Sequence, residues 1–151
     1  MKNSQPILIL VVLAILGILA FVWIYRNDTD TSNIVGCYQS TNGQDVHTLN
    51  IQSHEGNGVS GTMIFKNFEK DSSSGVFSGT YLEGVLVADY TFQSEGATSV
   101  MEVAFEKVGD DFIRGVGDVN ALGTRFADIS TVIYDASSPL NVFKKIECPV
   151  V

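Results

Sequence analysis

The chain has 151 residues, which is enough for one domain and a short additional segment. Of these residues 45% are hydrophobic, and the formal net charge at pH 7 is −8. All 17 acidic residues follow an apolar segment near the N-terminus, whereas two of the nine basic ones, Lys2 and Arg26, flank it and the other seven lie farther along the chain. This acidity argues against nucleic acid as a partner, because phosphate binding needs clustered Lys and Arg, and against a domain that lies flat on anionic lipid.

The apolar segment spans residues 7–25 and contains no charged or polar side chain. Its 19 residues match the length that a helix needs to cross the hydrocarbon core. A cleaved signal peptide has a shorter apolar region that ends at small residues, whereas here Ala20 is followed by more of the apolar run. Trp23 and Tyr25 stand where an interfacial aromatic belt would lie. We therefore predict a short tail over residues 1–6 and an uncleaved transmembrane signal anchor over residues 7–25.

The basic residues around this span set the predicted orientation. Lys2 and the α-amino group precede the span and Arg26 follows it, and a short, positively charged N-terminus favours the cytoplasmic side. We expect a single-pass protein of the cell membrane, with a polar linker over residues 26–33 and a domain over residues 34–151 on the extracytoplasmic side.

The stretch IVGC at residues 34–37 has the form of a lipobox, which would attach lipid to Cys37. A lipobox must end the apolar region of a signal peptide, but the polar linker separates residues 34–37 from the predicted span. We therefore favour the other interpretation, in which Gly36, Cys37 and Tyr38 open a β-strand.

Period-two alternation of apolar and polar residues recurs after residue 33, without a sustained helical pattern. Asn42-Gly43 and Asn57-Gly58 suit turns with positive φ at both central residues. Short strands joined by tight turns predict an all-β antiparallel meander of about eight strands, which closes most simply into an up-and-down barrel; a β-sandwich is the alternative. The predicted strands lie near residues 35–40, 45–53, 59–67, 76–82, 86–92, 100–106, 112–119 and 124–134.

Three short motifs carry a resemblance to known barrels over roughly residues 35–110. Gly36-Cys37-Tyr38 stands at the position of a Gly-x-Trp motif, and Val59-Ser60-Gly61-Thr62 and Gly79-Thr80-Tyr81 follow it. On these motifs the chain resembles the calycin group of lipocalin-like and avidin-like β-barrels. The aromatic residue is Tyr38, and the only Trp, Trp23, lies in the predicted span, so a biotin cage with Trp walls is not implied.

The run over residues 78–118 is similar to small uncharacterised bacterial membrane-anchored envelope proteins, which implies a location and no activity. No serine-hydrolase elbow, phosphate-binding loop or Cys/His metal cluster occurs, so we expect no enzyme, no cofactor and no metal. Many Phe and Tyr residues occupy the apolar positions, and side chains just fill an eight-stranded barrel. We expect a monomeric structural or interaction module with an envelope protein as partner; the alternative is a membrane-tethered, lipocalin-like binder of a small lipophilic ligand.

Three residues are candidates for ligand binding. Arg114 shares the parity of Phe112, so an inward side chain would place a cation in the lumen, where an anionic head group could bind; the alternative is a guanidinium stacked over the barrel end. His47 shares the parity of inward apolar residues, and the alternative is a partly buried His with one hydrogen-bond partner. Tyr90 lies on the apolar face of the strand near residues 86–92. The spacing between His47 and His54 predicts opposite faces.

The two Cys residues, Cys37 and Cys148, stand in the first predicted strand and in the C-terminal tail. In a closed meander the first and last strands are neighbours. The Cα atoms of the two Cys residues could then approach the distance most common in disulfides, roughly 5.5–6 Å. Such a bond persists in an oxidising compartment. The alternative is two unrelated thiols, with Cys37 acting as a small apolar residue.

The predicted anchor is tested by replacing Leu13 and Leu16 together with Arg. Each Arg near the centre of a span costs about 2.5–3.5 kcal/mol on insertion, so we expect the double variant to leave the membrane fraction, while a control with Ile at both positions remains there. Fractionation of cells that express the full chain measures this. An unaltered chain found in the soluble fraction, or a mature N-terminus just after Ala20, would contradict the anchor.

Overall fold

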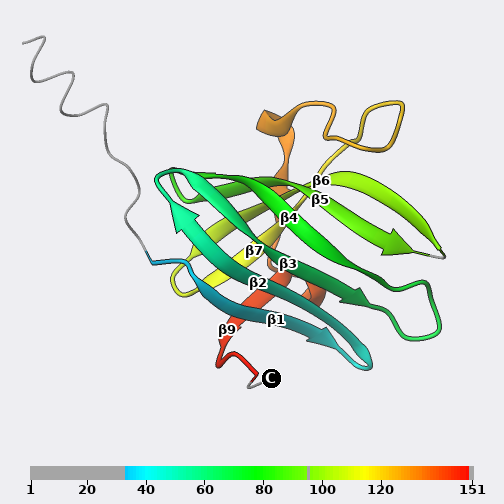
Figure 1. Cartoon of the computed structure of the whole chain (residues 1–151), viewed down its shortest axis with the longest axis horizontal. Coiled ribbons are helices and arrows are strands. Elements are labelled where there is room, and N and C mark those ends of the chain that lie inside the picture. The colour runs from blue at the N-terminus through cyan, green and yellow to red at the C-terminus, as the bar shows by residue number, and fades with distance from the viewer. Residues whose placement is uncertain (1–32, 95, 150–151) are drawn as a thin grey trace, which may run out of the picture.

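The computed structural model describes residues 33–94 and 96–149 (Figure 1). The predicted tail and span, and the linker up to residue 32, lie outside this part. Within it, no helix is long and apolar enough to cross a membrane. The elements are β1 (Gly36–Asn42), β2 (Asp45–Glu55), β3 (Gly58–Lys66), β4 (Ser73–Leu82), β5 (Val85–Ser94), β6 (Ala97–Val108), β7 (Asp111–Val116), the 3-10 helix η1 (Ile129–Thr131), β8 (Ile133–Tyr134), the 3-10 helix η2 (Pro139–Asn141) and β9 (Val142–Ile146).

The strands close into an antiparallel barrel. Strands β1 to β7 each pair with the next strand along the chain, and β9 pairs with both β7 and β1. The barrel therefore has eight strands, and β8 adds two residues to the edge of β7 beyond β9. The prediction of an all-β antiparallel barrel is confirmed, and the ribbon shows how the strands wrap around one interior (Figure 1).

The eighth strand does not lie where the sequence predicted it. Residues 124–134 form a connection that contains η1 and only the two-residue β8, because the Asp128 carboxylate accepts a hydrogen bond from the Ser130 backbone and caps a helical turn. The strand that closes the barrel is β9, in which Phe143 alone is fully buried. Two Lys residues on a five-residue segment hide its alternation.

Both predicted Asn-Gly turns are centred one residue away from the prediction. The central residues are Gly43-Gln44 in the first hairpin and Gly56-Asn57 in the second. In each turn only the Gly has a positive φ, of 64° and 59°. Hairpins of this kind need glycine at the first central position only, so the prediction that both central residues have positive φ is wrong here.

Side chains fill the barrel interior, as an eight-stranded barrel allows. Glycine is required at position 61, because a Cβ there would clash with the backbone oxygen of Asn50 and would lie 2.8 Å from Cε1 of Phe77. The core consists of Ile34, Tyr38, Leu49, Ile51, Val59, Met63, Phe65, Phe77, Tyr81, Leu86, Ala88, Tyr90, Val103, Phe105, Phe112 and Phe143.

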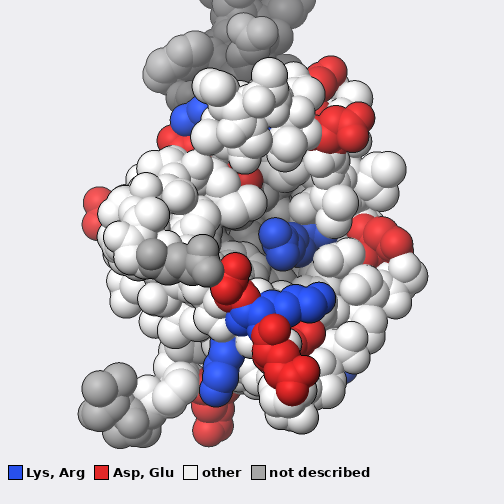
Figure 2. Space-filling view, turned by 90° about the vertical axis from the view of Figure 1, so that its right-hand side faces the viewer, with Lys and Arg blue, Asp and Glu red and all other residues white. Residues whose placement is uncertain are grey.

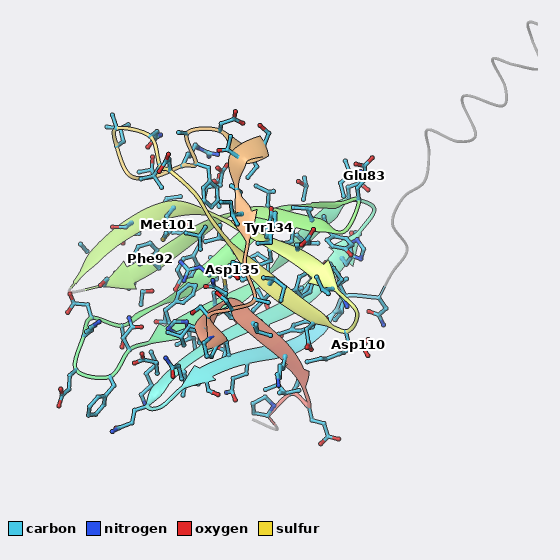
Figure 3. The ribbon with its side chains drawn as sticks, turned by 180° about the vertical axis from the view of Figure 1, so that it is seen from behind. Glu83, Phe92, Met101, Asp110, Tyr134 and Asp135 are labelled. Atoms are coloured by element: carbon cyan, nitrogen blue, oxygen red, sulfur yellow. A yellow bond between two sulfur atoms is a disulfide. The ribbon has the colours of Figure 1, made fainter. Side chains whose placement is uncertain are left out.

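One end of the barrel is plugged by the start of the domain, and we call it the closed end. Ile34 is fully buried there, and its carbonyl accepts a hydrogen bond of 2.8 Å from the Tyr38 hydroxyl. The Tyr38 ring packs edge to face on Phe112, with 4.9 Å between centroids. The β4–β5 and β6–β7 turns lie at this end, where Glu83 and Asp110 are labelled (Figure 3).

The two Cys residues join the ends of the domain. Cys37 in β1 and Cys148 after β9 form a disulfide with 5.1 Å between their Cα atoms, and the neighbouring residues of β1 and β9 pair directly. The prediction that first and last strands meet and that these residues are bonded is confirmed. The bond lies next to Tyr38, so it secures the strand that carries the plug.

Stability at alkaline pH tests the plug. Burial, and then the nearby Asp110, Tyr81 and Asp111, raise the pKa of Tyr38 to about 12 from its ordinary 10.0. The folded state therefore holds this proton more tightly than the unfolded chain, so the contribution to stability is complete below about pH 10 and is lost as the pH rises to about 12. We expect the free energy of unfolding, measured with urea, to fall across this window.

The Tyr38→Phe variant is the matched control. It should lose about 0.5–1.5 kcal/mol near neutral pH, because the hydrogen bond to Ile34 is removed, and its stability should fall less steeply above pH 10, since the other tyrosines titrate in both proteins. Parallel pH profiles for the two proteins would show that Tyr38 is not the group responsible.

Candidate functional site

The end opposite the plug carries the β1–β2, β3–β4 and β5–β6 turns, and we call it the open end. Phe92 and Met101 lie there, on the far side of the barrel from Glu83 and Asp110 (Figure 3). Both are partly buried against the core. Figure 2, which faces this end, shows a hollowed surface with basic side chains inside it.

Arg114 extends from β7 into this end of the barrel. Its guanidinium carbon lies 4.7 Å from the centroid of the Phe65 ring, so the cation is stacked on an aromatic face. Arg114 is partly buried, and this burial lowers its pKa. Among residues 33–94 and 96–149 no carboxylate forms an ion pair with it and no side chain or backbone oxygen accepts a hydrogen bond from it.

His47 lies on β2 and is almost fully buried. Its Nε2 donates a hydrogen bond of 3.0 Å to Oδ1 of Asn67 in the β3–β4 connection. Its Nδ1 has no partner in the described part of the chain, and neither has the buried hydroxyl of Ser40, which stands directly opposite on β1. The His47 ring packs edge to face on Phe65, with 5.0 Å between centroids.

Tyr90 on β5 is also fully buried, and burial raises its pKa. Its hydroxyl donates to the carbonyl of Met63 at 3.2 Å and lies 3.2 Å from Oγ of Ser73. Its ring lies 5.6 Å from that of Phe65, edge to face. Because this hydroxyl already has hydrogen-bond partners, Tyr90 contributes its apolar ring to the lining of a site.

Phe65 is thus the common neighbour of the three candidate residues, Arg114, His47 and Tyr90, and the sequence did not single it out. Its parity with Met63 marks it as inward, but only the closed barrel shows that β2, β5 and β7 all bring side chains to its ring. The structure therefore gathers all three candidates at one end, around one aromatic residue.

A cavity of about 140 Å³ opens beside Arg114, under the connection that follows β7. This connection is held on the barrel by Arg125, which pairs with Asp89 at 2.8 Å and with Glu102 at 3.0 Å. The second oxygen of Glu102 accepts from the backbone of Phe126, so this carboxylate is occupied on the loop side. The lining residues are Met101, Glu102, Val103, Arg114, Gly115, Val116, Gly117, Val119 and Phe126.

The second histidine does not lie where its spacing predicted. A bulge between Ile51 and Ser53 shifts the register of β2, and His54 pairs with the inward Val59. His54 therefore faces the interior as His47 does, but at the closed end, 5.5 Å from the Tyr81 ring. In residues 33–94 and 96–149 no group of three His, Cys, Asp or Glu side chains could hold a metal ion.

Compared with known proteins, the chain matches no protein-family model, no curated protein and no solved structure. The resemblance to calycin barrels therefore rests on the short sequence motifs alone. Gly36 begins β1, and the Tyr38 side chain is fully buried in the interior.

Proposed function

We propose that the protein is a non-enzymatic interaction module of the cell envelope, anchored to the membrane by residues 7–25. The filled interior is the observation that supports this proposal most directly. Sixteen residues form one continuous core, and their side chains occupy the space in which a barrel enzyme or carrier would hold its ligand. The surface and the open end remain as the parts that act on other molecules.

The disulfide supports the proposed location. A bond such as Cys37–Cys148 persists in oxidising compartments and is rare where thiols are kept reduced. The described chain enters the barrel at the closed end, through the buried Ile34, as the left side of Figure 1 shows. A tether before residue 33 therefore leaves the open end on the far side of the barrel, facing a partner.

The connection between β7 and β9 offers a surface for such a partner. It projects from the barrel (Figure 1), and its turn is closed by a hydrogen bond from Gly123 to Asn120. Leu122 on this turn is 82% exposed. Exposed apolar groups of this kind are typical of protein interaction sites. The exposed apolar residues here are Val116, Val119, Leu122, Ile129 and Ile133.

Photo-crosslinking in intact cells tests the proposal. A photoreactive amino acid at position 122 should give one discrete protein adduct, because Leu122 would be buried against the partner. The matched control is position 76, since Val76 is 59% exposed on the outer face of β4. Equal adducts at both positions, or none at position 122, would contradict an interaction module that uses this connection.

The second candidate is a membrane-tethered, lipocalin-like binder of a small lipophilic ligand. Met101, which lines the 140 Å³ cavity, and Phe92 at the same end of the barrel are both only partly buried, and they favour this candidate. This volume is below the roughly 300–1,000 Å³ of sites that enclose a drug-sized ligand, so most of such a ligand would stay outside the barrel. A small molecule that co-purifies with the protein in native mass spectrometry would favour this candidate over the first.

A further inference from the structure

The open end concentrates polar groups that lack partners. Buried polar atoms in folded proteins nearly always have a hydrogen-bond partner. In the described part of the chain three buried side-chain atoms have none, and two of them, Oγ of Ser40 and Nδ1 of His47, belong to residues that face each other across β1 and β2. Both atoms are therefore open to a hydrogen-bond partner from outside the described chain.

Arg114 adds an unbalanced charge to the same end. A guanidinium carries five N–H donors and no acceptor, and a cation removed from water is costly unless an anion balances it. The ring of Phe65 offsets part of this cost but accepts no conventional hydrogen bond. Glu102, the one carboxylate that lines the cavity, is engaged by Arg125 and by the backbone of Phe126.

We propose that the open end binds a single anionic group, a carboxylate or a phosphate monoester, with Arg114 as the main cation and the Ser40 hydroxyl as an additional donor. Arg114 and His47 both contact the Phe65 ring, so the anion lies beside that ring. The Ser40 hydroxyl donates directly.

The ligand also carries an apolar chain. Phe92 and Met101 lie at the rim of the open end, and Val103 and Phe126 line the cavity beside Arg114. An acyl or alkyl chain that leaves the anionic group would pack along these side chains. This inference rests on the ligand-binding candidate above and names its chemical class; it is independent of the partner surface around Leu122.

Nuclear magnetic resonance of the full chain in lipid nanodiscs tests the site, with isotope-labelled histidine as the reporter. The chain has only two histidines, and they lie at opposite ends of the barrel, so His54 is an internal control. Octanoate or octyl phosphate should shift the His47 signals saturably and leave those of His54 in place. Comparison of the two probes, and of inorganic phosphate alone, identifies the preferred head group.

Variants assign the effect to the site. Arg114→Gln should weaken the affinity for the preferred probe tenfold or more, because charge-assisted hydrogen bonds are lost, while Arg114→Lys should retain more of it. Lys107→Gln is the matched control and should bind as the unaltered chain does, because Lys107 also lies over an aromatic ring, Phe112, but at the closed end.

Three results would overturn the proposal. They are the absence of a saturable His47 shift with both amphiphilic probes, an equal shift with the neutral 1-octanol, and unchanged affinity in Arg114→Gln. The first would mean that water alone satisfies Ser40 and His47. If Arg114→Gln does not fold, Ser40→Ala replaces it, with a severalfold loss of affinity expected and no loss contradicting the site. Failure here would leave the crosslinking result at position 122 unaffected.

Discussion

The closure of the barrel by β9 is the constraint on which the rest of the structure depends. Strand β9 makes three residue pairs with β1 and two with β7, whereas β5 and β6 share ten. The seam that β9 forms with β1 and β7 therefore has fewer backbone pairs than the β5–β6 pairing. The buried Phe143 and the Cys37–Cys148 bond hold this seam together. Without β9 the edges of β1 and β7 would be exposed to other chains, and the core would be open on one side.

Closure also explains why the two ends of the barrel differ. At the closed end the chain supplies its own plug, in which Tyr38 hydrogen-bonds to Ile34. At the open end two buried polar atoms have no hydrogen-bond partner in the described chain. The guanidinium of Arg114 is stacked there on the ring of Phe65 and has no ion-pair partner among the described residues. The same geometry that buries a continuous aromatic core therefore leaves a polar, incompletely satisfied rim, and this asymmetry supports a function at the open end.

Local patterns in the sequence predicted the fold well, and long-range consequences were harder to predict. Alternation and turn residues identified the hairpins from β1 to β7, and the expected closure of the meander predicted that the two Cys residues meet. Strand β9 was not predicted, because two Lys residues interrupt its alternation. The prediction that His54 lies on the opposite face from His47 was wrong, because the bulge in β2 is not visible in the alternation of the sequence. The role of Phe65 follows only from closure, which brings β2, β5 and β7 around one ring.

The seam is tested most directly by counting free thiols in the full chain, isolated from the membrane without reductant, unfolded, and treated with an alkylating reagent before intact mass measurement. A barrel closed by Cys37–Cys148 predicts no alkylation without reductant and two alkyl groups after reduction. Two alkyl groups on the unreduced chain would contradict both the covalent closure of the seam and the proposed placement in an oxidising compartment.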